Sequence, residues 1–163
     1  MPPVVSIVGK SKSGKTTLIE ALISELKSRG YRIATIKHSV HRLSFDKPDK
    51  DSWRHIRAGS DATAIVSPDQ VVLIKPATEE PDLNETARIF SEDYDIILAE
   101  GFKQSSAPKL EVHRKAAGPP LSHINNLIAI ATDEPLETKT RQFSLHDIKG
   151  LADLLENSFI KPK

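Results

Sequence analysis

The segment GKSKSGKT at residues 9–16 constrains the fold and chemistry of this chain more than any other feature. It follows a short β-branched run, Val4–Val8, and precedes a stretch whose apolar residues keep helical spacing as far as Gly30. A strand, the pattern G-x-x-x-x-G-K-[ST] and a helix, in that order, are typical of a phosphate-binding loop. Small residues let the backbone wrap closely around a phosphate, and the helix adds N–H donors and its positive dipole end.

Two side chains of this loop have expected roles in holding a nucleotide and its metal ion. Lys15 is expected to reach the β and γ phosphates, and the Thr16 hydroxyl is expected to ligate Mg²⁺. The loop by itself does not distinguish hydrolysis, phosphoryl transfer and switching. The residues predicted to contact the nucleotide here are Gly9, Lys10, Ser11, Lys12, Ser13, Gly14, Lys15, Thr16 and Thr17.

Strand-like and helix-like patterns alternate along most of the remaining chain, which indicates an α/β fold. Strands are predicted at 31–37, 95–99, 109–114 and 127–131, and helices at 53–58, after the N-cap Asp82, and over 148–159. Two β-rich runs predict a β-hairpin inserted at about 62–75. We therefore predict one domain over residues 1–163 with a three-layer, P-loop NTPase-like fold, a mostly parallel sheet and helices on both faces.

The composition excludes several classes of site and partner. Lys and Arg total 23 and Asp and Glu total 22, so the net charge of +1 gives no general reason to expect nucleic acid or an anionic membrane as partner. The absence of cysteine excludes disulfides, thiolate nucleophiles, zinc–thiolate sites and cysteine-ligated iron–sulfur clusters. No run approaches the ~18 apolar residues of a membrane span, and the first residues lack a charged signal-peptide region. We therefore expect a cytoplasmic protein.

A carboxylate follows the most apolar of the predicted strands. Glu100 comes directly after 95–99, and in a parallel sheet the carboxyl ends of the strands lie at one edge, together with the phosphate loop. An acidic residue at this position can hold Mg²⁺ or one of its water ligands, although it can also cap the turn before Gly101. Asp95 begins the same strand, about 16 Å away at ~3.3 Å per residue, so it cannot share that ion.

The loop after the second predicted strand is a candidate for sensing the γ-phosphate. It begins with Lys37 and His38 and continues into a charged stretch from Asp46 to Ser52. A carboxylate or a histidine in such a loop can orient a water molecule, although a solvated charged loop has the same composition. His38 and His41 could also be a metal pair, but two imidazoles without further ligands favour a role without a metal.

Asp133 follows the predicted strand at 127–131 and could recognise the base of the nucleotide. A carboxylate can accept hydrogen bonds from N1–H and the 2-amino group of guanine, a pair of donors that adenine lacks. This favours GTP over ATP. The Asn-Lys-x-Asp sequence usual in GTPases is missing, and Asp133 could instead open a turn before Glu134 and Pro135.

Six segments in a fixed order carry a resemblance to a known family: GKSKSGKTTL, IKHSVH, DKPDKDSWRHIRAGSDAT, DIILAEGFK, IAIATDEP and DIKGLADLLE. Together they resemble the molybdopterin-guanine dinucleotide biosynthesis protein B (MobB) family, from Val4 to about Leu155. The phosphate loop is generic. The specific part of the resemblance is the order and spacing of Lys37-His38, Lys50-Asp51-Ser52 and Glu100-Gly101-Phe102-Lys103.

The resemblance implies a small P-loop GTP-binding protein with weak GTPase activity, an adaptor in the attachment of GMP to molybdopterin that gives molybdopterin guanine dinucleotide. It also implies a guanylyltransferase as partner, molybdopterin or its guanine dinucleotide as a further ligand, and a homodimer. The implied catalytic residues are Lys15, Glu100 and Asp51. The residues implied to hold Mg²⁺ are Thr16, Glu100 and Asp46, and those implied to line the adjacent cleft are Lys37, His38, Asp46 and Asp51.

Two other classes of function fit parts of the sequence. A small-molecule kinase can also combine a phosphate loop with this length, but no clear lid carries the candidate arginines Arg54, Arg57 and Arg114. For a metallochaperone GTPase, the lack of cysteine and the scatter of the 6 histidines argue against a transferable metal site. We expect the hairpin at 62–75 at a dimer or partner surface, because the backbone groups of its edges need pairing. Lys10 matches in position the signature lysine of dimerising ATPases of the same superclass, which is not a hallmark of the MobB family.

Overall fold

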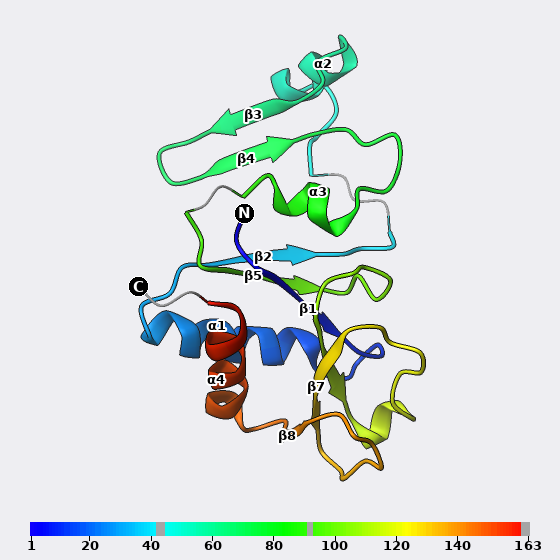
Figure 1. Ribbon diagram of the computed structural model, residues 1–163. Helices are drawn as coiled ribbons and strands as arrows, with labels where there is room; N and C mark the ends of the chain where they lie inside the picture. The colour runs from blue at the N-terminus through cyan, green and yellow to red at the C-terminus, as the bar shows by residue number, and fades with distance from the viewer. Residues whose placement is uncertain (42–44, 91–92, 161–163) are drawn as a thin grey trace. The chain divides into compact units, whose positions relative to one another are not determined.

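Six parallel strands form the central sheet of the larger of two units into which the chain divides (Figure 1). The computed structural model describes residues 1–41, 45–90 and 93–160. The larger unit comprises Met1–His38 and Asp82–Lys163, and the smaller unit comprises Ser39–Pro81. The strands of the sheet are β1 (Val4–Val8), β2 (Ile33–Lys37), β5 (Ile96–Glu100), β6 (Lys109–His113), β7 (Leu127–Thr132) and β8 (Gln142–Ser144), in the order β2-β5-β1-β6-β7-β8.

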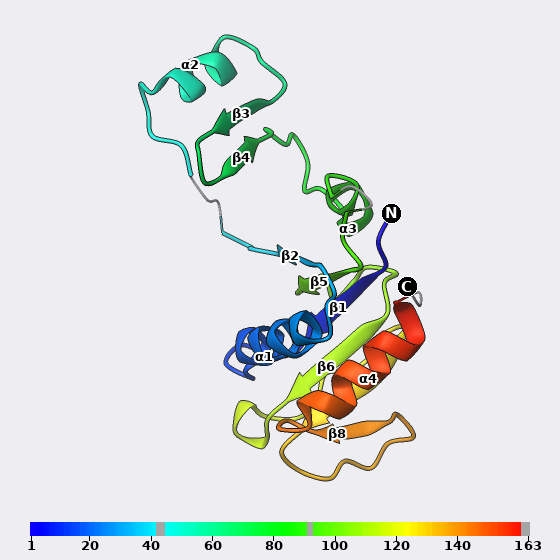
Figure 2. The same ribbon diagram turned by 90° about the vertical axis from the view of Figure 1, so that its left-hand side faces the viewer.

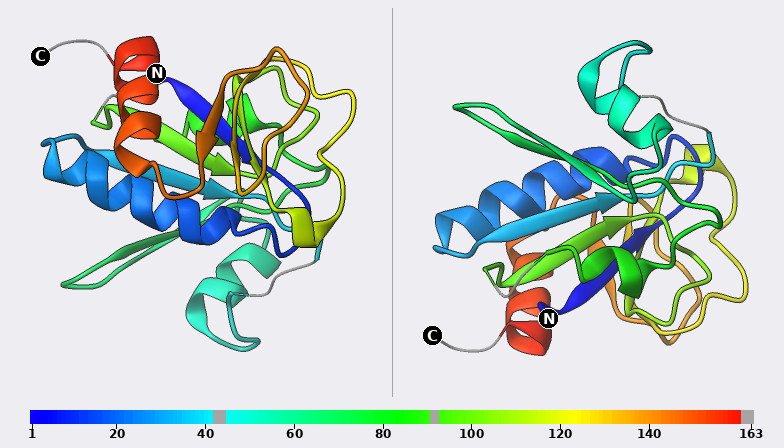
Figure 3. Two further views of the ribbon diagram at one scale, coloured as in Figure 1. Left: turned by 90° about the horizontal axis from the view of Figure 1, so that it is seen from below. Right: turned by 90° about the horizontal axis from the view of Figure 1, so that it is seen from above.

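Helices cover both faces of this sheet, which confirms the predicted three-layer α/β architecture. Helices α1 (Lys15–Ser28) and α4 (Ile148–Phe159) pack on one face and contact each other (Figure 2). The short helix α3 (Leu83–Ala87) packs on the other face, as the right-hand view of Figure 3 shows. A single 3-10 turn, η1 (Lys115–Ala117), follows β6. Within the described ranges, no helix combines the length and apolar character needed to cross a membrane.

The side chains of β5 alternate between two hydrophobic cores. Ile96 and Leu98 belong to the core beneath α1 and α4, whereas Ile97 and Ala99 belong to the core beneath α3. Successive side chains of a strand point to opposite faces, so a strand covered on both sides is apolar along its whole length. This explains the nearly continuous apolar run that the sequence shows there.

The ends of α1 and α3 follow from local sequence signals. In α1 the buried residues Leu18, Ile19, Leu22 and Leu26 form one stripe, and Gly30 follows the helix with a φ of +86°. Helix α3 begins after Asp82, whose carboxylate accepts a hydrogen bond from the Glu85 N–H at 2.7 Å. The predicted N-cap is thereby confirmed.

The smaller unit contains the predicted hairpin. Strands β3 (Thr63–Val66) and β4 (Val71–Ile74) pair antiparallel, and the turn between them is closed by a hydrogen bond of 2.9 Å from the Ser67 N–H to the Gln70 carbonyl. Helix α2 (Asp51–Arg57) precedes the hairpin and begins two residues earlier than the sequence predicts. That the whole chain acts as one domain stays a prediction.

Arg29 joins the end of α1 to α4. Its guanidinium pairs with Glu25 at 2.8 Å, with Asp153 at 2.7 Å and with Glu156. The Tyr31 hydroxyl also donates to Glu156. The hydrogen bonds from Tyr31 and Arg29 hold the pKa of the Glu156 carboxyl below its ordinary value.

Replacing Arg29 by alanine should lower the Tm by roughly 2–4 °C, because the substitution breaks three ion pairs that are partly exposed. The pKa of Glu156 is lowered in the folded state, so its contribution is present above the ordinary glutamate range and is lost as pH falls through the lowered value. Thermal unfolding should therefore show the largest difference between wild type and Arg29→Ala near neutral pH. Arg32→Ala, at an exposed arginine 3.8 Å from Asp95, is the control and should change the Tm less. A difference that persists unchanged at acidic pH would contradict this interpretation.

Candidate nucleotide site

The loop between β1 and α1 curls back on itself at three residues. Gly9, Lys12 and Gly14 have φ values of +157°, +62° and +95°, and the Ser13 N–H donates to the Lys10 carbonyl at 3.2 Å. No side chain caps α1 at Gly14, and the first turn of the helix has no acidic residue. The N–H groups of that turn therefore have no competing acceptor from a capping side chain, which suits an anion at this position.

The Lys15 side chain lies over this loop. Its Nζ donates to the carbonyls of Lys10 at 2.8 Å and of Gly9 at 3.2 Å. Burial lowers the pKa of Lys15, nearby Lys103 and Lys37 act in the same direction, and Glu100 opposes them. Burial and the two neighbouring lysines together disfavour the charged form of Lys15 more than Glu100 favours it. The negative charge of bound phosphates would stabilise that charged form.

Glu100, the last residue of β5, lies beside Thr16 in the first turn of α1, as the sequence predicts for the two magnesium ligands. The Thr16 hydroxyl donates to the two Glu100 oxygens at 3.2 and 3.1 Å, and Lys37 Nζ lies 3.5 Å from the same carboxylate. Backbone pairing fixes this geometry, because Glu100 is in register with Ile7 of β1 and with Lys37 of β2. Mg²⁺ at a nucleotide site takes a few oxygen ligands from the protein, such as a hydroxyl or a carboxylate, and phosphates and water supply the others.

Ser13 provides a second observation that fits a bound phosphate. This side chain is 1% exposed, and its Oγ has no hydrogen-bond partner in the described part of the chain. Buried hydroxyls normally have a partner, so an unpaired one inside a phosphate loop suits an absent polar ligand. The donor set of the loop therefore fits a phosphate, and the Thr16–Glu100 pair fits Mg²⁺.

The lack of a side chain at Gly9 is required for the loop to approach β6. A Cβ atom there would lie 2.5 Å from the Val112 carbonyl oxygen and 2.6 Å from Ser13 Oγ. Both distances are far below van der Waals contact, and the first partner is backbone. The position therefore needs glycine.

Gly9→Ala should weaken binding of a nucleoside triphosphate at least about tenfold, because the loop must shift away from β6 by a strain of roughly 1–3 kcal/mol. Gly30→Ala is the matched control. Its φ of +86° is also unfavourable for alanine, but nothing lies within 4 Å of the added atom, so it should cost stability and leave binding unchanged. Titration calorimetry with both variants measures the difference. Equal affinities would show that the close approach to β6 is not needed.

Arg114 contacts the loop although the sequence suggested it only as a possible lid arginine. Its Nε donates to the Ser13 carbonyl at 3.0 Å, and its guanidinium lies 3.1 Å from the place where a Cβ of Gly14 would be. Its contact with the loop could have been predicted from its place directly after β6, since the carboxyl end of this parallel strand lies at the same edge of the sheet as the loop. The contact holds the loop from the side of β6.

His38 lies at the end of β2, beside the residues that follow β5. Its N–H donates to the Glu100 carbonyl at 3.0 Å, and its ring contacts the Phe102 ring in a tilted arrangement with 4.9 Å between centroids. Gly101 makes this possible, because a Cβ there would lie 3.0 Å from the His38 Cβ. The structure thus brings Lys37, His38 and Glu100 to the edge that carries the phosphate loop.

Asp133 follows β7, and its carboxylate already supports a neighbouring loop. Its Oδ1 accepts a hydrogen bond of 2.8 Å from the Lys115 N–H of η1. The role of Asp133 in recognising guanine stays a prediction.

Asp46 and Asp51 belong to the smaller unit. Asp46 accepts a hydrogen bond of 3.0 Å from the Ser52 hydroxyl, and Asp51 is the first residue of α2. Their predicted roles near Mg²⁺ and in catalysis stay predictions. Among the residues that the structure describes, no group of three or more His, Asp or Glu could hold a metal ion. A P-loop magnesium site does not need such a group, since phosphates and water supply most of its ligands.

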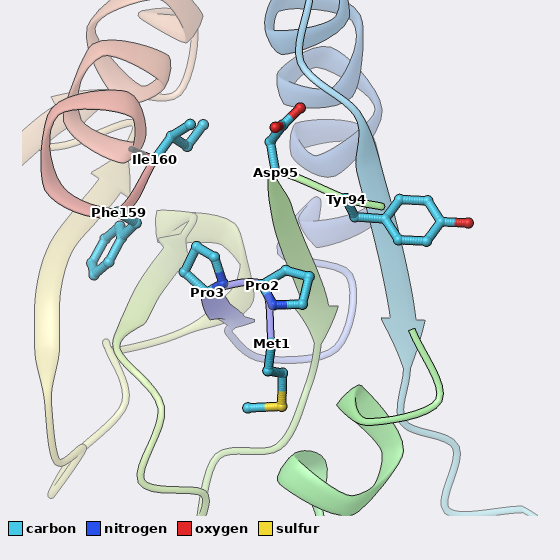
Figure 4. Close-up of a pocket in the computed structure, with 7 residues that line it drawn as sticks. All are labelled: Met1, Pro2, Pro3, Tyr94, Asp95, Phe159 and Ile160. Atoms are coloured by element: carbon cyan, nitrogen blue, oxygen red, sulfur yellow. The ribbon is translucent and has the colours of Figure 1, made fainter. Parts of the chain in front are cut away.

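A cavity of about 410 Å³ lies at the other end of the strands (Figure 4). Its lining comes from the N-terminus before β1, from Tyr94 and Asp95 before β5, and from Phe159 and Ile160 at the end of α4. Ligands of open α/β sheets bind outside the carboxyl ends of the strands, and this cavity is at their amino ends. The phosphate loop, and not this cavity, is therefore the candidate site.

The sequence of the chain matches that of a known family. The family model of molybdopterin guanine dinucleotide synthesis protein B, MobB, matches residues 4–133, which include the phosphate loop and Glu100. This chain belongs to the MobB family. The predicted family and the P-loop NTPase-like fold are thereby confirmed.

Two curated MobB relatives and one solved MobB structure resemble the chain along most of its length. The molybdopterin-guanine dinucleotide biosynthesis adapter protein of Haemophilus influenzae is 38% identical over 157 residues, which are 95% of this chain and 88% of that protein. The Escherichia coli K12 protein of the same name is 36% identical, over 95% of this chain and 92% of its own length. The crystal structure of Bacillus subtilis MobB gives a TM-score of 0.74 at 26% identity, over 99% of both chains.

Proposed function

We propose that this chain binds GTP with Mg²⁺ and acts as an adapter in the biosynthesis of molybdopterin guanine dinucleotide. The observation that carries the nucleotide part is the contact of the Thr16 hydroxyl with the Glu100 carboxylate, at 3.1 and 3.2 Å, beside the phosphate loop. The adapter part is supported by the names of the H. influenzae and E. coli relatives. A cytoplasmic location is part of the same proposal.

The chain's own residues would hold the triphosphate as follows. Backbone N–H groups of the loop and of the first turn of α1 bind phosphate oxygens. Lys15 Nζ exchanges its two loop carbonyls for oxygens of the β and γ phosphates. Thr16 and Glu100 would hold Mg²⁺, which would supply positive charge at the phosphates, and Lys37 and Lys103 add positive charge at the same edge.

We propose that hydrolysis is slow. The Glu100 carboxylate is occupied by Thr16 and lies 3.5 Å from Lys37, which suits a group that positions the metal and not one that takes a proton from water.

The proposed partners are a guanylyltransferase, molybdopterin or its guanine dinucleotide, and a second copy of the chain. The hairpin supports a protein partner, because its apolar side chains are exposed: Ile65 by 42%, Val66 by 74%, Val71 by 68% and Leu73 by 49%. Exposed apolar side chains on a two-stranded sheet whose edges are open to pairing are typical of a surface that binds another protein.

Gel filtration of the purified chain mixed with the guanylyltransferase, with and without Mg²⁺ and GTP, tests the adapter part. We expect the two proteins to elute together in at least one condition. Separate elution in both conditions would contradict the adapter part and leave the nucleotide part to its own measurement. The elution volume of the chain alone tests the homodimer.

A further inference from the structure

A cavity of about 190 Å³ lies next to the phosphate loop, between the start of α1 and the turn that joins β8 to α4. Thr17 and Ala21 line it from α1, Leu145, His146 and Ile148 line it from the turn and α4, and Arg114 lines it from the end of β6. All six belong to the larger unit. We propose that this cavity binds the purine base of the nucleotide, an inference that rests on the proposed nucleotide binding.

The cavity continues directly from the phosphate loop. Gly14 belongs both to the loop and to the cavity lining, and Thr17 comes directly after the residue that contacts Glu100. Ala21 lies four residues farther along the helix, about one turn or ~5.4 Å. A nucleotide with its phosphates on the loop and at the start of α1 would therefore have this cavity next to it.

The size and chemistry of the cavity fit one flat ring system. Its volume of about 190 Å³ lies below the roughly 300–1,000 Å³ of pockets that bury a drug-sized ligand, so it suits a base and not a whole nucleotide. Ala21, Leu145 and Ile148 give it apolar walls that gain from covering the faces of a ring. Thr17, Arg114 and His146 bring hydrogen-bonding groups that can meet the edge of a base.

The walls are held in place before any ligand binds. Arg114 is fixed by its bond to the Ser13 carbonyl at 3.0 Å. The turn on the other side is fixed by the Leu145 N–H, which donates to the Thr132 carbonyl at 3.2 Å, and by the His146 N–H, which donates to Ser144 Oγ at 3.2 Å. A site that is already ordered loses little entropy when it binds a ligand.

This location differs from the one that the sequence suggests. The residues that line the cavity do not include Asp133, whose Oδ1 accepts from the Lys115 N–H. A base in the cavity would contact the turn after β8 and the end of β6. Sequence patterns gave no indication of this turn as part of the site, because its residues lie about 130 positions from the phosphate loop.

Titration calorimetry of the full chain in Mg²⁺, with GTP and with inorganic tripolyphosphate, separates base from phosphate binding. We expect wild type to bind GTP more tightly than tripolyphosphate, because only GTP fills the cavity. Ala21→Phe puts a ring into the cavity and should weaken GTP at least about tenfold, while the affinity for tripolyphosphate stays within about twofold of wild type. Ser24→Phe adds the same ring at an exposed position of α1 outside the lining and should change neither affinity.

Three results would overturn the inference, and they are distinguishable. Wild-type affinity for GTP in a folded Ala21→Phe variant would remove the base from the cavity, as would equal affinities of wild type for GTP and tripolyphosphate, and both would leave the phosphate loop in place. Binding of neither ligand by wild type would overturn the proposed nucleotide binding and the cavity with it. If Ala21→Phe does not fold, Ile148→Ala, which removes an apolar wall, replaces it with the same expected pattern of weaker GTP and unchanged tripolyphosphate.

Discussion

Lys15→Ala is expected to weaken binding of GTP with Mg²⁺ by at least about 30-fold, because removing one partner of a buried charge pair costs roughly 2–5 kcal/mol. Lys15 Nζ lies over the loop at 2.8 Å from the Lys10 carbonyl, where it can reach the phosphates, and Lys37 and Lys103 are the nearest cations that act on it. Titration calorimetry measures the loss.

The same variant should remain folded, which separates a binding role from a structural one. Burial lowers the pKa of Lys15, so the folded protein holds this charge at a cost, and alanine should leave the Tm unchanged or slightly higher. Lys27→Ala, at an exposed lysine in the last turn of α1, is the matched control and should change neither affinity nor Tm. Native circular dichroism with wild-type affinity in Lys15→Ala would contradict the assignment of the phosphate loop.

Glu100→Gln should reduce the dependence of GTP binding on Mg²⁺. Glutamine keeps the size of the side chain and can still accept from the Thr16 hydroxyl, but it removes the charge that attracts the metal. We expect the affinity for Mg²⁺ in the ternary complex to fall about 10–100-fold, the range found when groups that orient metal ligands are removed. Without Mg²⁺, GTP should bind as well as to wild type or better, because a negative charge next to the phosphates is gone.

A Mg²⁺ titration at constant GTP, followed by calorimetry with and without a chelator, tests this expectation. Glu20→Gln, at an exposed glutamate of α1, is the control for the loss of one negative charge and should leave the titration unchanged. If Glu100→Gln also leaves it unchanged, Glu100 serves only to cap the turn before Gly101.

The meeting of Thr16 and Glu100 was predictable because it depends on two local patterns and one rule of topology. The phosphate loop follows the carboxyl end of β1, and Glu100 is the last residue of the apolar strand β5. Parallel strands place their carboxyl ends at one edge of the sheet. The register of the sheet agrees with this prediction, because Glu100 pairs with Ile7 near the end of β1 and with Lys37 at the end of β2. The hairpin was predictable for a similar reason, because its turn and its strands are adjacent in the sequence.

The parts that were not predicted depend on pairing between distant segments. Strand β8 has three residues, and Phe143 is its single buried side chain, so it has no periodic pattern of its own and exists through its pairing with β7. Strand β6 alternates polar and apolar residues, which is typical of a half-exposed strand, yet all five of its residues are buried.

Two polar side chains of β6 form hydrogen bonds with the loops before and after the strand, which the alternating pattern does not reveal. Lys109 Nζ donates to the carbonyls of Ser105 and Ala107, and Glu111 accepts a hydrogen bond of 2.7 Å from the Leu121 N–H. Burial lowers the pKa of Lys109. Arg114, at the end of this strand, reaches Ser13 for the same reason: the contact spans 101 positions of the sequence.

Competition between GTP and ATP for the wild-type chain in Mg²⁺, with phosphate release followed in the same samples, tests the central proposal most directly. We predict that GTP competes at concentrations at least about tenfold lower than ATP, a difference of roughly 1.4 kcal/mol. Phosphate should appear well below about one turnover per second, as for a P-loop protein without an added catalytic arginine. Preference for ATP, or binding of neither nucleotide, would contradict the proposed GTP-binding adapter.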